Sequence, residues 1–187
     1  MDETHGRMRV AVCGLAAVAV LVGGCAKPRW QQRVEGAVTY LGHRNWIVVA
    51  DAAYPAQRSP GISTAVTRAD HLEVVKAVLD TVDRAPHVRA KVYVDAEMQH
   101  VPEKYAPGIG QYRSRLETML KGRPVEAVPH EKLIARLDEA AKTFKVIVLK
   151  TDLALPYTSV FIELDCGYWS PEAEAALRKA MASAAGQ

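Results

Sequence analysis

Four side chains in this sequence are of types that transfer protons or hold hydroxyl groups, and each stands next to a structural break. They are His43 after Gly42, Asp51 after the apolar run 46–50, His130 after Pro129 and Tyr157 after Pro156. An imidazole can give or take a proton near neutral pH, while a carboxylate or a phenol can fix a hydroxyl group. Together they would suit acid–base chemistry on a hydroxyl-bearing ligand.

Each of these residues also has a structural interpretation. Ligands of open parallel sheets bind beyond the carboxyl ends of the strands, which favours a binding role for Asp51. The same carboxylate could instead cap its own loop. His43 and His130 are also the kind of residues found solvated in a loop or at the start of a helix, and Tyr157 could simply pack.

Composition excludes several classes of protein. The chain has 187 residues, 24 Lys and Arg against 21 Asp and Glu, and 49% hydrophobic residues, which is typical of a globular protein. No run of Lys or Arg is present, so no nucleic-acid partner is expected. Cys13, Cys25 and Cys166 lack the Cys/His spacing of a metal site, so we expect no zinc or iron–sulfur centre.

The N-terminus has the pattern of a targeting segment. Residues 10–24 carry no charge and follow Arg7 and Arg9. The run is shorter than the roughly 20 residues needed to span a bilayer, and it resembles a signal peptide. Residues 21–25 (LVGGC) resemble a bacterial lipobox, which implies cleavage before Cys25 and lipidation of its thiol. We therefore predict a signal peptide over 1–24, a lipidated tether over 25–29 and one domain over 30–187.

This interpretation places the protein outside the cytoplasm. It would lie on the periplasmic face of the cell envelope, attached to the membrane by its lipid anchor only. Ala26, rather than Asp, follows Cys25 and favours the outer membrane. If translation starts at Met8, or if the N-terminus is misassigned, a cytoplasmic location is the alternative. Cys166 would have no intramolecular disulfide partner.

Hydrophobic periodicity predicts alternating helices and strands, and hence an α/β fold. Residues 51–69 contain two prolines and a glycine and are predicted to form a long substrate loop. We expect strands 145–149 and 160–164 to be neighbours, joined by the loop 150–159. The predicted helices are 30–41, 70–85, 112–120, a helix starting at 130 and one starting at 171; the predicted strands are 46–50, 88–94, 125–128, 145–149 and 160–164.

Several segments together resemble the D-ribose pyranase and L-fucose mutarotase family, in order and in approximate spacing. These are 41–43 (LGH), 47–55 (IVVADAAYP), 67–70 (TRAD), 112–113 (YR), 129–131 (PHE) and 151–159 (TDLALPYTS). The resemblance implies a three-layer α/β/α fold with a mostly parallel central sheet. It also implies a cofactor-free isomerase that opens and recloses a monosaccharide ring by acid–base catalysis.

The resemblance further implies roles for individual residues. His43 matches the catalytic histidine, and the substrate-binding positions fall on Asp51, Arg68, His130, Tyr157 and Ser159. Ser159 replaces an asparagine of the family pattern. Ile134 stands where ribose-type members have a lysine, and Asn45 stands where an acidic residue is usual. The alternatives are therefore a sugar-binding lipoprotein that has lost the chemistry, or an envelope protein with a vestigial pocket.

His43 and Asp51 are separated by the strand 46–50. At ~3.3 Å per residue this strand spans about 16 Å, so the two side chains would lie at its opposite ends. Either the His43 loop folds back over the sheet, or residues of one subunit complete the site of another. The family resemblance implies ring-like oligomers with sites at subunit boundaries. We therefore predict a homo-oligomer whose pocket combines two chains.

Overall fold

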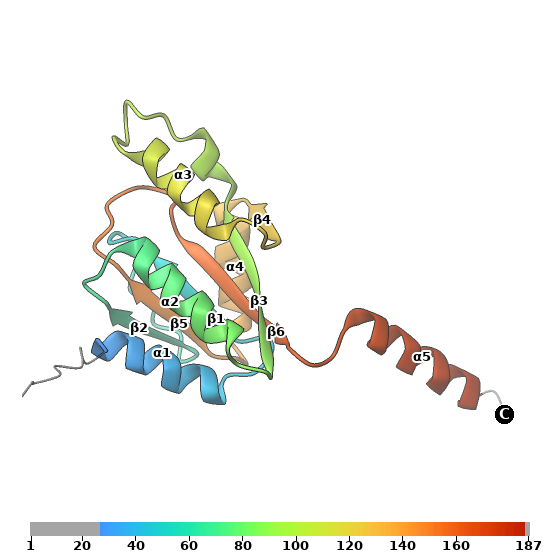
Figure 1. Cartoon of the computed structure of the whole chain (residues 1–187). Helices are drawn as coiled ribbons and strands as arrows, with labels where there is room; N and C mark the ends of the chain where they lie inside the picture. Colours follow the sequence, from blue (N-terminus) through green and yellow to red (C-terminus); the bar gives the residue numbers. More distant parts are fainter. Residues whose placement is uncertain (1–26, 186–187) are drawn as a thin grey trace, which may run out of the picture.

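The computed structural model describes residues 27–185. The predicted signal peptide and Cys25 lie outside these residues. A single six-stranded sheet forms the centre of the fold, with strand order β2-β5-β1-β6-β3-β4 (Figure 1). The strands are β1 (Trp46–Ala50), β2 (Ile62–Val66), β3 (Val88–Asp95), β4 (Val125–Val128), β5 (Val146–Lys150) and β6 (Val160–Cys166).

Five of the six strands run in the same direction. β1, β2 and β5 pair in parallel, as do β3 and β4, while β6 is antiparallel to both β1 and β3. The prediction of a mostly parallel sheet is therefore confirmed. The carboxyl ends of five strands and the amino end of β6 all meet at one edge, which we call the carboxyl edge.

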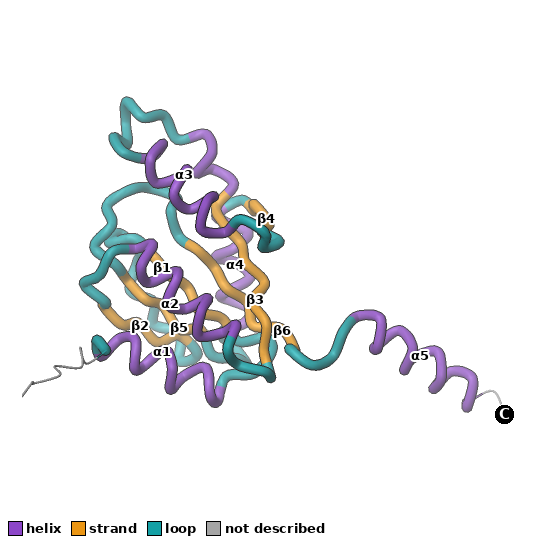
Figure 2. Tube along the Cα trace, viewed as in Figure 1, coloured by secondary structure: helices purple, strands orange, loops and turns teal. Residues whose placement is uncertain are grey.

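Helices cover both faces of the sheet, as expected for three layers (Figures 1 and 2). One face packs against α1, α2 and α3, and the other packs against α4. The helices are α1 (Arg29–Tyr40), α2 (His71–Asp83), α3 (Ile109–Leu120), α4 (His130–Ala140) and α5 (Pro171–Ala185), with a 3-10 helix η1 (Ala96–His100) after β3.

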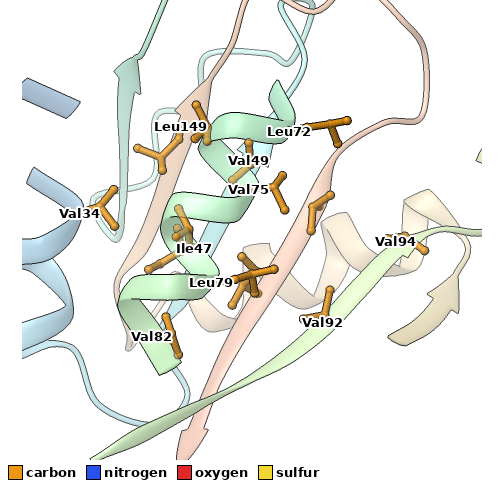
Figure 3. Packing of buried hydrophobic residues seen from close by; sticks show 14 of the residues in the cluster. Val34, Ile47, Val49, Leu72, Val75, Leu79, Val82, Val92, Val94 and Leu149 are labelled. Atoms are coloured by element: carbon orange, nitrogen blue, oxygen red, sulfur yellow. The ribbon is translucent and has the colours of Figure 1, made fainter. Parts of the chain in front are cut away.

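The core explains why β1 is central. All five of its residues are buried, with Ile47 and Val49 facing the α1–α2 side and Trp46, Val48 and Ala50 facing α4. Figure 3 shows α2 lying over the first of these faces, with Val75, Leu79 and Val82 among the packed side chains. Burying one such side chain stabilises the fold by about 1.5–3 kcal/mol.

The structure corrects two of the expected elements. The segment 51–69 is not a loop throughout, because β2 forms within it at the edge of the sheet, where its residues stay partly exposed. β5 and β6 are not neighbours, because β1 lies between them and the segment 151–159 crosses the end of β1. The sheet consequently has six strands rather than five.

α5 lies apart from the rest of the molecule. It begins at Pro171, as predicted, and extends away from the sheet in the views of Figures 1 and 2. Trp169, Leu177 and Met181 are exposed along this segment. None of the helices within residues 27–185 combines the length and the apolar character required to cross a membrane.

Candidate functional site

The carboxyl edge gathers most of the side chains that could do chemistry. Asp51 directly follows β1, Asp95 ends β3, and His130 begins α4 two residues after β4. In β6, Val160 lies opposite both Val49 and Val94, so the preceding Ser159 lies beside the ends of β1 and β3. Chain segments far apart in the sequence are thus brought to one place by strand direction alone.

Asp95 and His130 form a hydrogen-bonded pair. Oδ1 of Asp95 lies 2.9 Å from Nδ1 of His130. The Asp95 side chain is fully buried, and its second oxygen, Oδ2, has no hydrogen-bond partner among residues 27–185. Burial is the main reason that the pKa of Asp95 rises to about 6; His130 opposes this rise, while Glu97 and Asp51 add to it.

The position of His130 is fixed by its backbone as well as by its ring. The backbone N–H donates to both carboxylate oxygens of Glu97, at 3.0 and 3.1 Å, which satisfies one of the free N–H groups at the start of α4. The imidazole packs edge-on against the rings of Tyr157 and Phe161, with centroid distances of 5.7 and 6.4 Å. His130 remains partly exposed, with about 27% of its side chain accessible. The ring is therefore held firmly but can still be reached from solvent.

Asp51 has the loop-capping role that was one of its two interpretations. Its Oδ1 accepts the N–H of Ala53 at 2.7 Å, forming an Asx turn. Its carboxylate also raises the pKa of Asp95 and of Tyr54, although it is not the main cause of either shift, which places its charge near both groups. Capping and ligand binding are compatible, because a carboxylate has two oxygens and several lone pairs.

Two further side chains present buried polar atoms at this edge. Neither the Tyr54 hydroxyl nor Oγ of Ser159 has a hydrogen-bond partner among the described residues. Burial, followed by the charges of Asp138, Asp95 and Asp51, raises the pKa of Tyr54 to about 12, so its phenol stays protonated. An unpaired buried polar atom costs about 1–3 kcal/mol, and most such atoms in folded proteins are paired. Tyr54, Asp95 and Ser159 thus each leave a buried polar atom at this edge without a partner among residues 27–185.

His43 lies at the opposite edge of the sheet. It is exposed, in the turn between α1 and β1. The neighbouring Asn45 fastens this turn, because its Oδ1 accepts from Lys145 N and its Nδ2 donates to Gly42 O, both at 2.9 Å. The turn does not fold back over the sheet, so the first of the two arrangements considered for His43 is wrong. The chain does not bring His43 to Asp51.

Arg68 lies at the carboxyl edge but away from the Asp95–His130 pair. It follows β2, which is separated from β1 by β5, and it adopts a left-handed conformation with φ of 52°. Its exposed side chain lines a hollow of about 350 Å³ together with Asp70, His71 and Asp152. The structure therefore groups Asp51, His130, Tyr157 and Ser159, and places Arg68 beside a different hollow.

His71 is a structural histidine that the pattern did not single out. It is buried, with Nε2 3.3 Å from the Val49 carbonyl oxygen and Nδ1 3.1 Å from the Tyr112 hydroxyl. Burial lowers its pKa to about 4, so the ring is neutral at physiological pH. Through these contacts it connects α2, β1 and α3.

Asp95 and Tyr54 were missed by the sequence analysis for different reasons. Asp95 follows an apolar strand as Asp51 does, so the rule that selected Asp51 applies to it equally. Tyr54 carries no such signal, because its burial depends on how the loop after β1 packs towards α4. Within residues 27–185 no three His, Cys, Asp or Glu side chains are grouped as metal ligands would be.

The fold and the cluster at the carboxyl edge define the class of this protein: a three-layer α/β domain with carboxylate, imidazole and hydroxyl side chains gathered where its strands converge. The model of the RbsD / FucU transport protein family matches residues 28–166. The chain belongs to this family, which confirms the family resemblance found in the sequence. The match ends at Cys166, so α5 lies outside it.

One solved structure agrees with the family at the level of the fold, and two others are reported as similar chains. The match to RbsD from Bacillus subtilis complexed with D-ribose has 20% sequence identity and a TM-score of 0.50. It covers 74% of this chain and 93% of the RbsD chain. The fucose mutarotase from Streptococcus pneumoniae in complex with L-fucose is 15% identical over 68% of this chain and 87% of its own, with a TM-score of 0.43. FucU from Bifidobacterium longum is 15% identical over 71% of this chain and 92% of the FucU chain, also with a TM-score of 0.43. The comparison with curated proteins gives no match.

Proposed function

We propose that this protein interconverts the ring forms of a free monosaccharide, as a mutarotase or a pyranase. The main support is the pairing of the buried Asp95 with the partly exposed His130, at the edge of the sheet where Asp51 and Ser159 also lie. Membership of the family, and relatives described in complex with D-ribose and L-fucose, favour a sugar as the ligand. Ribose-like and fucose-like sugars are both candidates.

Ring opening requires one proton donor and one proton acceptor. A base takes the proton of the anomeric hydroxyl, the bond between the anomeric carbon and the ring oxygen breaks, and an acid protonates that oxygen. Rotation and reclosure on the other face give the other anomer, and reclosure through another hydroxyl changes the ring size. The step balances without an oxidant, a reductant or a covalent intermediate.

His43 is our candidate for one of these two groups, and a second copy of the chain would supply it. His43 and Asp51 lie at opposite edges of the sheet in one chain, and the turn that holds His43 is fastened by Asn45. A homo-oligomer in which the His43 edge of one subunit meets the carboxyl edge of another would complete the site. Asp51, His130, Tyr157 and Ser159 would then hold the sugar, with Arg68 at its periphery.

The alternative is a sugar-binding protein without catalysis. It is favoured by the departures from the family pattern, since Ser159 offers one hydroxyl in place of an amide and Asn45 is engaged in holding its turn. Export as a lipoprotein remains a separate prediction, because it rests on residues 1–26.

Magnetisation-exchange NMR on D-ribose, L-fucose and related sugars tests the proposal directly. The full-length chain should accelerate exchange between anomers or ring forms. His43→Ala should lose most of an acceleration of about 10²- to 10⁴-fold, the usual contribution of acid–base catalysis. The matched control is His100→Ala, which removes an exposed histidine of η1. Broadening of the sugar signals without exchange would support the binding alternative, and unchanged exchange in His43→Ala would remove that residue from catalysis.

A further inference from the structure

We propose that Asp95 is a positioning residue that fixes His130 as an acid–base group of the site. By accepting the Nδ1–H of the imidazole, Asp95 would leave Nε2 as the atom that exchanges a proton with the sugar. This inference rests on the proposed function for its substrate, but the pairing itself can be tested without any sugar. It assigns a proton-transfer role to a histidine that the family resemblance marks only as a binding residue.

The geometry gives each atom of the pair a defined role. The Asp95 side chain is buried, and its Oδ1 lies 2.9 Å from His130 Nδ1. An ionised carboxylate can only accept a hydrogen bond, so Nδ1 must carry the proton. Neutral His130 then has a bare Nε2, and no protein group among residues 27–185 is hydrogen-bonded to this atom. Nε2 is thus the nitrogen left free for a ligand.

Among the groups around Asp95, the His130 imidazole is the one that its negative charge can stabilise. The titratable groups whose charges interact with it are His130 from α4, Glu97 from η1, Asp51 from the end of β1, Tyr54 from the following loop and Tyr112 from α3. His130 is the only one of these five that can be cationic. A buried carboxylate acts strongly on a cation beside it, because the low dielectric screens the interaction weakly. When Nε2 takes a proton, Asp95 therefore stabilises the imidazolium that forms.

A purely structural role explains less of the arrangement. An asparagine could hold His130 without the cost of a buried charge, but its amide can donate as well as accept and would therefore pair with either tautomer. Asp95 bears that cost and also leaves Oδ2 without a partner. A carboxylate that orients an imidazole and stabilises its protonated form is a recurrent device in acid–base catalysis. In ring opening, His130 Nε2 would accept the anomeric proton, while His43 of the second copy would protonate the ring oxygen.

Nitrogen NMR of the histidine side chains tests the pairing without reference to activity. In the wild-type protein at pH 8 we expect His130 to carry its proton on Nδ1 and to have a bare Nε2. In Asp95→Asn this preference should weaken, and Nε2–H should become a major form. The control is Glu139→Gln, which removes an exposed carboxylate of α4, the helix that begins at His130, and should leave the tautomer unchanged. A wild-type His130 protonated on Nε2, or a tautomer unchanged in Asp95→Asn, would overturn the proposal.

Exchange kinetics then connect the pairing to catalysis. Asp95→Asn should lower kcat by about 10²- to 10⁴-fold with little change in KM, and should move the acid limb of the pH profile. Glu139→Gln should keep the wild-type rate and profile. An unchanged kcat and profile in Asp95→Asn would overturn the catalytic part of the proposal. If the wild type exchanges no sugar, the proposed function fails while the tautomer measurement still decides the role of Asp95.

Discussion

The buried carboxylate of Asp95 makes the stability of the folded protein depend on pH. Burial raises the pKa of Asp95 from 3.8 to about 6 in the folded protein, so the folded state binds the proton more tightly than the unfolded chain does. As the pH rises from about 4 to 6, the folded protein loses stability, because the unfolded chain gives up this proton first. Above that window the ionised carboxylate costs the fold up to roughly 3 kcal/mol.

Replacing Asp95 by asparagine should therefore stabilise the protein at neutral pH. We expect the free energy of unfolding of Asp95→Asn to exceed that of the wild type by about 1–3 kcal/mol at pH 7.5. The gain should disappear near pH 4, where the wild-type carboxyl is protonated. Urea unfolding at the two pH values measures both effects.

Comparing the wild type with Asp95→Asn separates the effect of Asp95 from that of His71, the other buried group that titrates. His71, with its pKa lowered to about 4, costs stability as the pH falls below its ordinary value of 6.5, which is opposite in sign to Asp95. His71 is the same in both proteins, so its contribution cancels in the difference. A variant less stable than the wild type at pH 7.5 would show that Asp95 is net stabilising, contrary to this account.

Strand direction brings four of the predicted site residues to one edge of the sheet, namely Asp51, His130, Tyr157 and Ser159. Their roles there remain predictions. Asp95 could have been found by the same rule as Asp51. Tyr54 could not, because nothing local reveals that its hydroxyl is buried without a partner.

At the scale of elements, the position of β2 depends on one glycine. A Cβ atom built on Gly61 would lie 2.0 Å from the carbonyl oxygen of Ala141, just after α4. The carbonyl of Gly61 also accepts the N–H of Val146 at the start of β5, at 2.9 Å. The close approach of these two backbones allows no side chain at this position.

Substitution of Gly61 by alanine should destabilise the protein by about 1–3 kcal/mol or more, the usual cost of overpacking a rigid contact. Gly36→Ala is the matched control, because Gly36 lies within α1 and a Cβ there meets nothing within 4 Å. That change should stabilise the protein by roughly 0.5–1 kcal/mol through helix propensity. Thermal unfolding of both variants is the measurement, and equal effects at the two glycines would contradict the packing at Gly61.

The elements that the sequence predicted are those with a strong local signal. The apolar run of β1 and the capping of α2 by Asp70, whose side chain accepts from Glu73 N at 3.0 Å, gave accurate positions. β2 was missed because it is an edge strand whose residues are partly or fully exposed. Its sequence therefore lacks the apolar run that marks a central strand. The order of β5, β1 and β6 is set by non-local pairing, which no local pattern reveals.

At the scale of the whole molecule, the two edges of the sheet hold the two halves of the proposed site. His43 lies at the edge where β1 begins, and the Asp95–His130 pair lies at the edge where β3 and β4 end. One chain cannot join these edges, because β1 keeps them about 16 Å apart at ~3.3 Å per residue. The proposed function therefore requires that subunits meet edge to edge.

This requirement predicts complementation between two inactive variants. His43→Ala keeps an intact carboxyl edge, and His130→Ala keeps an intact His43. In a random equal mixture of the two chains, about a quarter of the sites would combine the intact edge of one with the intact histidine of the other. Co-expression of the two variants, followed by exchange NMR, should recover roughly that fraction of the wild-type rate.

The reciprocal mixture distinguishes a shared site from one contained in a single chain. Wild type mixed equally with the double variant, His43→Ala together with His130→Ala, should keep about a quarter of its sites if each site uses two chains. If each site used one chain, that mixture would keep about half, and the two single variants would not complement each other at all. Absence of complementation in co-assembled chains would place both histidines in one subunit, which the fold does not permit without rearrangement of the His43 turn.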